Sequence, residues 1–102
     1  MNQKKKVRKR FRDSTFERDG HKCVTCKTKD IKLDAHHITP RVKMPNGGYV
    51  KENGISLCEP CHLKAEQFLQ NEITDKNFSP KNLYKLIGSS YAEAFVASQK
   101  LE

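Results

Sequence analysis

The sequence lacks tryptophan and any long apolar run. Only 35% of its 102 residues are hydrophobic, and its mean hydropathy is −0.83. No segment is apolar over the length that a bilayer requires, so no membrane-spanning helix is expected. A chain of this length is expected to form one domain with a small core. Such a core often needs a bound metal or disulfides for stability.

The basic residues near the N-terminus are followed by no apolar stretch, so we do not expect them to act as a secretory signal. We therefore expect the protein to stay in a reducing compartment. There, the four cysteines of the chain are expected to hold a metal ion more often than to form disulfides.

Acidic residues are missing from the first twelve positions, which carry most of the net charge of +8. The basic residues there are Lys4, Lys5, Lys6, Arg8, Lys9, Arg10 and Arg12. A solvated, disordered tail and a nuclear import signal are two interpretations of such a run. A third is a flexible arm, residues 1–10, that binds the phosphates of a nucleic acid. The chemistry of the remaining chain favours this third interpretation.

The pattern of apolar residues predicts both helices and strands. The expected elements, in chain order, are a helix over 11–19, strands over 31–38 and 49–57, a helix over 61–69, and helical segments from residue 79 onward, interrupted at Gly88. Pro45-Asn46-Gly47-Gly48 predicts a turn between the strands. The Ser79-Pro80 pair predicts a helix cap followed by a first-turn proline.

The cysteines form two pairs, Cys23-x-x-Cys26 and Cys58-x-x-Cys61, separated by 31 residues. Two residues between thiolates let one tight turn present both sulfurs to one ion, and two such turns supply tetrahedral ligation. Four buried thiols or two disulfides are the alternatives. We predict a structural Zn²⁺ that joins the segment before the first strand to the start of the helix after the second.

Two of the four histidines, His36 and His37, are adjacent, and a third, His62, directly follows Cys61. A zinc ion held by four thiolates needs none of them. His36 and His62 are therefore candidates for a second ion with open positions, as a catalytic metal requires. The alternatives are a solvated pair at a strand end and, for His62, a surface residue or a spare zinc ligand. His21 lies in a Gly-His-Lys turn that suggests no partner.

The segment Ala35-His36-His37-Ile38-Thr39-Pro40 and the segment from Asn53 to His62 together resemble the HNH nuclease family. The resemblance covers about residues 11–69 and includes all four cysteines. It implies a small ββα-metal (HNH) domain of the α+β class with a four-cysteine structural zinc. We expect this domain to span residues 11–78, with an N-terminal helix and with residues 79–102 as a C-terminal helical extension of it.

The resemblance also implies residue roles. His37 would be the general base, His36 and His62 the ligands of one catalytic divalent cation, and Asn53 the brace of the loop next to His37. Neighbouring residues of a strand point to opposite faces, which suits different jobs for the two adjacent histidines. The cation would be Mg²⁺, Mn²⁺ or another divalent metal. Asp34 could orient His36 or could be an exposed carboxylate, and Glu66 has a similar standing.

These features predict a metal-dependent DNA endonuclease that hydrolyses phosphodiester bonds. Two alternatives are a zinc-stapled DNA-binding module without catalysis and an accessory nuclease subunit of a phage packaging or restriction assembly. The expected partner is DNA, and no membrane is involved. The expected location is the cytoplasm of a bacterial, archaeal or phage-infected cell. No residue pattern specifies an oligomeric state.

Overall fold

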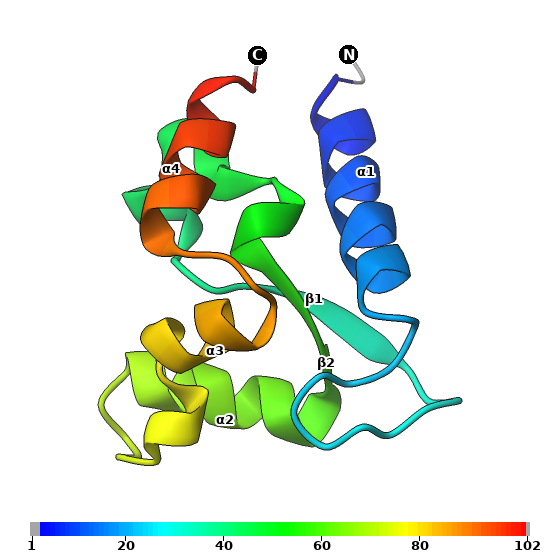
Figure 1. The fold of residues 1–102 in the computed structure, drawn as a ribbon, viewed down its shortest axis with the longest axis vertical. Coiled ribbons are helices and arrows are strands. Elements are labelled where there is room, and N and C mark those ends of the chain that lie inside the picture. The colour runs from blue at the N-terminus through cyan, green and yellow to red at the C-terminus, as the bar shows by residue number, and fades with distance from the viewer. Residues whose placement is uncertain (1–2, 102) are drawn as a thin grey trace.

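A computed structural model describes residues 3–101 (Figure 1). Its helices are α1 (Gln3–Arg18), α2 (Glu59–Leu69), α3 (Pro80–Leu86) and α4 (Tyr91–Gln99), and its strands are β1 (Leu33–His37) and β2 (Gly54–Cys58). The start of α1 and the end of α4 lie at the same end of the molecule. The predicted α+β class, with an N-terminal helix and C-terminal helices, is confirmed.

The N-terminal helix α1 begins at Gln3 rather than at the predicted Phe11. The expectation of an unstructured arm therefore differs from the structure, in which the basic residues lie on a helix. Lysine, arginine and glutamine have high helix propensity, and Lys9 pairs with Asp13 one turn later at 2.6 Å. The helix ends where Gly20 adopts a φ of 70° and His21 donates its backbone N–H to Phe16.

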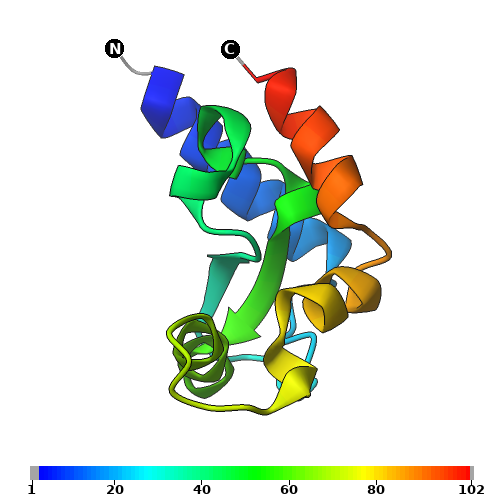
Figure 2. The same ribbon diagram turned by 90° about the vertical axis from the view of Figure 1, so that its left-hand side faces the viewer.

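The two strands form an antiparallel hairpin in which His37 is paired with Gly54 and His36 with Ile55. Helices α1 and α2 lie on opposite sides of this hairpin (Figure 2). Every residue of β2 is buried, because the strand is covered on both faces. At Gly54, an added Cβ would lie 2.5 Å from Thr15 Oγ1, so glycine allows α1 to approach the strand closely.

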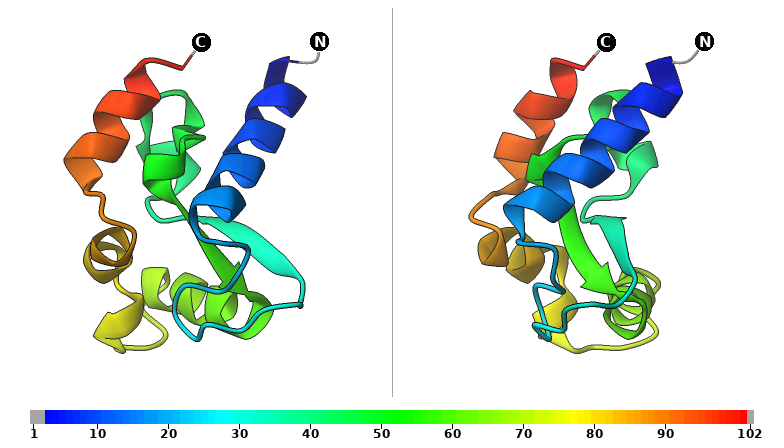
Figure 3. Two further views of the ribbon diagram at one scale, coloured as in Figure 1. Left: turned by 45° about the vertical axis from the view of Figure 1, so that its right-hand side comes forward. Right: turned by 90° about the vertical axis from the view of Figure 1, so that its right-hand side faces the viewer.

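Three 3₁₀ turns, Arg41–Lys43, Pro45–Gly48 and Lys51–Asn53, form the connection between the strands. The second strand was expected to start at Tyr49, but the last of these turns delays it to Gly54. The predicted turn at residues 45–48 is confirmed, and both of its glycines have positive φ. Helices α1 and α4 flank the connection (Figure 3).

The C-terminal helices begin at capped positions. The Ser79 hydroxyl accepts from the backbone N–H of Asn82 at the start of α3, and Ser90 accepts from Glu93 at the start of α4. Gly88, with a φ of 70°, separates the two helices as predicted. Buried residues of both helices, among them Leu83 and Ala94, extend the core. Within residues 3–101 no helix is long and apolar enough to cross a membrane.

Candidate metal and catalytic centre

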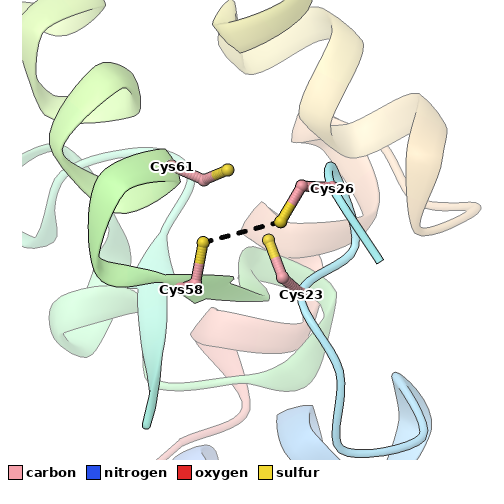
Figure 4. Close-up of side chains that lie close together, drawn as sticks. All are labelled: Cys23, Cys26, Cys58 and Cys61. Atoms are coloured by element: carbon pink, nitrogen blue, oxygen red, sulfur yellow. Dashed lines mark hydrogen bonds between the residues drawn. The ribbon is translucent and has the colours of Figure 1, made fainter. Parts of the chain in front are cut away.

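The four cysteines come together between the segment before β1 and the start of α2 (Figure 4). Their sulfur atoms all lie within 4.8 Å of one another, and Cys26 Sγ is 3.6 Å from Cys58 Sγ. None of the four forms a disulfide. Because Zn–S bonds of about 2.3 Å place tetrahedral sulfurs about 3.8 Å apart, the arrangement fits one zinc ion.

Backbone hydrogen bonds form the first cysteine turn and attach it to the sheet. Cys23 accepts from Lys27 N at 2.8 Å, and Val24 N donates to Ser56 O in β2 at 2.9 Å. The second turn continues directly from β2 into α2, where Pro60 occupies the first turn of the helix. Both cysteine pairs are thus fixed to the same strand.

The thiols influence one another electrostatically. Burial raises the pKa of Cys23, but hydrogen bonds from Thr25 and neighbouring groups outweigh this and bring it to about 6. The pKa of Cys61 is raised to about 12, by burial first and then by Cys58 and Cys23. One thiolate therefore forms readily and opposes ionisation of the next, so a bound cation is needed for all four to be thiolates.

A second potential metal site lies between β1 and α2. It consists of His36, His62 and Glu66, each with one ligand atom within 4.8 Å of the others. Glu66 Oε2 is 3.4 Å from His36 Nδ1 and 3.3 Å from His62 Nε2. The sequence indicated the two histidines, and Glu66 joins them because it lies one turn after His62 on α2.

His36 is only 2% exposed, and neither of its ring nitrogens has a hydrogen-bond partner among the described residues. Burial, followed by the charges of His62 and His37, lowers the pKa of His36 to about 3. The ring is therefore a neutral imidazole in the folded protein at pH 7. An unpaired buried nitrogen is costly unless something binds it, so His36 suits a metal ligand.

Asp34 does not contact His36, contrary to one of the two interpretations of the sequence. Its Oδ2 atom lies 3.1 Å from Nδ1 of His62 instead. Asp34 and His36 share a strand face, but α2 places His62 opposite Asp34. This contact favours the tautomer in which Nδ1 carries the proton, which leaves Nε2 unprotonated toward Glu66.

His37 points to the opposite face of β1 from His36, as strand geometry predicts. Its ring stacks on Phe11 of α1 at a centroid distance of 4.4 Å and meets the edge of Tyr49 at 4.7 Å. Burial first, and then the charge of Arg41, lowers the pKa of His37 to about 4. Its Nε2 atom is buried and, within the described residues, has no hydrogen-bond partner. His37 is therefore neutral at pH 7 and lies outside the three-residue metal cluster.

A cleft of about 360 Å³ lies between His37 and the potential metal ligands on α2. Among the residues that line it are His37 from one face of β1, and His62 and Glu66 from α2. The cleft thus brings the imidazole of His37 to the same space as two of the three potential metal ligands. Arg41, at the start of the strand connection, also lines it.

Asn53 is fully buried and holds the residues that follow His37. Its side chain accepts from Thr39 N at 3.0 Å and donates to Thr39 O at 3.1 Å and to Gly48 O at 3.2 Å. Its own backbone carbonyl accepts from Ile38 N. These bonds fix the turn that ends β1.

A family model described as HNH endonuclease matches residues 23–68. This segment of the chain is similar to the HNH endonuclease family. Searches among curated proteins and among solved structures gave no match. The matched HNH segment contains the four cysteines, His36, His37, Asn53, His62 and Glu66, and the match indicates a nuclease or DNA-binding module.

Tyr84, outside the HNH segment, was missed by sequence reasoning. Its hydroxyl, on α3, donates to Asn53 Oδ1 at 2.7 Å and lies 2.7 Å from Thr39 Oγ1. A contact between residues so far apart in sequence leaves no local signal. The sequence showed only that Tyr84 lies within the predicted C-terminal helical segment, next to Leu83, which is buried in the structure.

The basic residues of α1 do not gather on one face. Lys4 and Arg8 line a groove beside the HNH segment, whereas Lys6, Lys9 and Arg10 line another side of the helix. Lys5 and Arg12 are exposed and line neither surface. The seven residues predicted to bind nucleic acid are therefore distributed around the helix.

Proposed function

We propose that the protein is a metal-dependent endonuclease that hydrolyses DNA phosphodiester bonds. The observation that carries this proposal is the cleft between β1 and α2. His37, held off the metal cluster, shares this cleft with His62 and Glu66. A DNA-binding module would have no use for an unpaired imidazole beside a second set of metal ligands.

His37 would act as the general base. A water molecule attacks the phosphorus atom, its proton passes to the neutral imidazole, and the bond from phosphorus to the 3′ oxygen breaks. Such a base contributes about 10²- to 10⁴-fold to the rate. A pKa of about 4 keeps the ring neutral, and a bound phosphate would raise that pKa toward the working pH.

His36, His62 and Glu66 would hold the catalytic cation. A divalent ion there would act as a Lewis acid on the scissile phosphate and the leaving 3′ oxygen. Asp34 would orient His62 through its Nδ1 proton. Two imidazoles suit first-row metals such as Zn²⁺ or Ni²⁺, whereas the carboxylate also suits Mg²⁺ or Mn²⁺, so this ligand set is compatible with several divalent metals.

The four cysteines would hold a structural zinc ion that fixes β2 and the start of α2. Because His62 directly follows Cys61, a zinc ion bound by Cys61 would also fix the position of His62 in the catalytic site. Residues 79–101 would form part of the same nuclease domain, because Tyr84 contacts Asn53.

Plasmid cleavage tests the proposal. The zinc-loaded parent protein is expected to cut plasmid with added Mg²⁺ or Mn²⁺ and to leave it intact when no divalent ion is added. His37→Ala should retain zinc, helix content and DNA binding but lose cleavage. His21→Asn is a suitable control, since His21 is an exposed histidine with a φ of 56°, a conformation that asparagine tolerates.

The competing function is a DNA-binding module without catalysis, which the basic residues of α1 would also serve. It predicts binding of plasmid without cleavage under every metal condition. Cleavage by His37→Ala at the parent rate would instead refute the assignment of His37 as the base while leaving a nuclease in place.

A further inference from the structure

The groove beside the HNH segment has a volume of about 540 Å³ and lies between the first turns of α1 and the strand connection. Lys4 and Arg8 line it from α1, and Arg41 and Tyr49 from the connection. The other lining residues are Val7, Val42, Asn46, Gly47 and Leu101. Three cations and, among the described lining residues, no carboxylate face this groove.

We propose that this groove binds the sugar-phosphate backbone of DNA next to the bond that is cut. The inference rests on the proposed function, and it selects which of the basic residues of α1 contact the substrate. The groove would receive phosphates rather than base edges, so its contribution would be independent of sequence.

Arg41 connects the groove to the catalytic cleft, because its side chain lines both. Tyr49 provides a second connection, since its ring meets His37 at a centroid distance of 4.7 Å. A strand with its scissile phosphate in the cleft would therefore place a neighbouring phosphate within reach of Arg41 and the groove.

Tyr49 also holds the two arginines of the groove in place. Arg41 Nη1 donates to the Tyr49 hydroxyl at 2.9 Å, and the Arg8 guanidinium lies 5.9 Å from the centre of the Tyr49 ring. Arginine binds phosphate through paired donors, and ordering the side chain beforehand reduces the entropy lost on binding. The groove is thus a preorganised cationic surface.

The opposite side of α1 has a different charge balance. Lys6, Lys9 and Arg10 there share their surface with Asp13 and Glu17, and Lys9 is paired with Asp13 at 2.6 Å. These carboxylates weaken the attraction for phosphate. The helix therefore offers one purely cationic side, at Lys4 and Arg8, and one mixed side.

The two sides allow a matched experiment. Lys4→Ala/Arg8→Ala and Lys6→Ala/Arg10→Ala each remove one lysine and one arginine, four residues apart, from the same helix. We would measure binding of a labelled mixed-sequence duplex by fluorescence anisotropy over a range of KCl concentrations. The His37→Ala background without added divalent metal prevents cleavage, and circular dichroism checks that each variant is folded.

Each lost phosphate contact should lower the slope of log affinity against log salt by about 1. Lys4→Ala/Arg8→Ala should therefore lower the slope by about 2, and Lys6→Ala/Arg10→Ala by less than half as much. Equal changes, or no change from Lys4→Ala/Arg8→Ala, would overturn the proposal. Equal changes would assign the effect to the general charge of the helix.

Arg41→Ala and Lys43→Ala form a second pair, since both residues are exposed in the same turn and only Arg41 lines the groove. Arg41→Ala should lower the slope by about 1 and Lys43→Ala by less. Because these readouts measure binding alone, the groove can fail while His37-dependent cleavage stands, or hold while cleavage proves absent.

Discussion

Replacement of Tyr84 by phenylalanine tests whether the C-terminal helices hold the catalytic loop. Tyr84 is 4% exposed, and its hydroxyl bridges Asn53 Oδ1 and Thr39 Oγ1, each at 2.7 Å. Phenylalanine fits the same space but removes this bridge. Asn53 Oδ1 would keep its bond from Thr39 N, whereas the Thr39 hydroxyl would lose its Tyr84 partner.

Each buried hydrogen bond contributes about 0.5–1.5 kcal/mol net, so the loss of two should lower the free energy of unfolding by about 1–3 kcal/mol. For a domain of this size each kcal/mol shifts the melting temperature by about 4–8 °C. Thermal unfolding at fixed salt and saturating zinc measures the shift. The substitution should also slow cleavage, by up to about 10²-fold, without weakening DNA binding, because the turn after His37 loses part of its support.

Tyr91→Phe is the matched control, because Tyr91 is 51% exposed, whereas the hydroxyl of the buried Tyr84 donates to Asn53. Its effect on stability should stay within about 0.5 kcal/mol. If Tyr84→Phe melts and cuts like Tyr91→Phe, the bridge does not support the loop and the reasoning is wrong.

Three further predictions concern the metal sites and the sheet. Metal analysis should find about one tightly held zinc ion per chain, and a strong chelator should unfold the protein; a folded, zinc-free protein would contradict the zinc assignment. Glu66→Gln should weaken binding of the catalytic cation, measured by Mn²⁺ titration calorimetry, and Asp34→Asn should weaken it by about 10- to 100-fold through His62; unchanged affinity in both would remove the carboxylates from the site. Gly54→Ala should destabilise the fold by about 1–3 kcal/mol in urea unfolding, because the new Cβ would overlap Thr15 and Phe11, and a neutral result would show that α1 can shift away.

The sequence predicted the elements and the chemistry where the signal was local. The cysteine spacing predicted the four-sulfur cluster, and the strand period of two placed His36 and His37 on opposite faces. Ser79-Pro80 and Gly88 predicted where the C-terminal helices begin and separate. Within each cysteine pair, strand and helix cap, these features depend on residues only a few positions apart, so local backbone geometry decides them. That the two cysteine pairs meet is decided by the fold.

The start of α1 was harder to predict because the first residues combine high helix propensity with dense positive charge. Propensity and the Lys9–Asp13 pair favour a helix, whereas repulsion among the cations opposes it. The structure extends the helix to Gln3. This extension gives the basic residues a fixed helical phase that a flexible arm would lack.

Only the tertiary structure decided which groups meet. Asp34 contacts His62 rather than His36 because α2 packs across β1 at a particular position. Tyr84 reaches Asn53 because α3 folds back against the turn that ends β1, and Lys4 and Arg8 share a groove with Arg41 because of where the strand connection lies beside α1. The sequence by itself determined which chemical groups the chain carries and which face of its own helix or strand each occupies. The relative placement of those elements is set by the sum of many packing contacts between distant residues, and no local pattern encodes that sum.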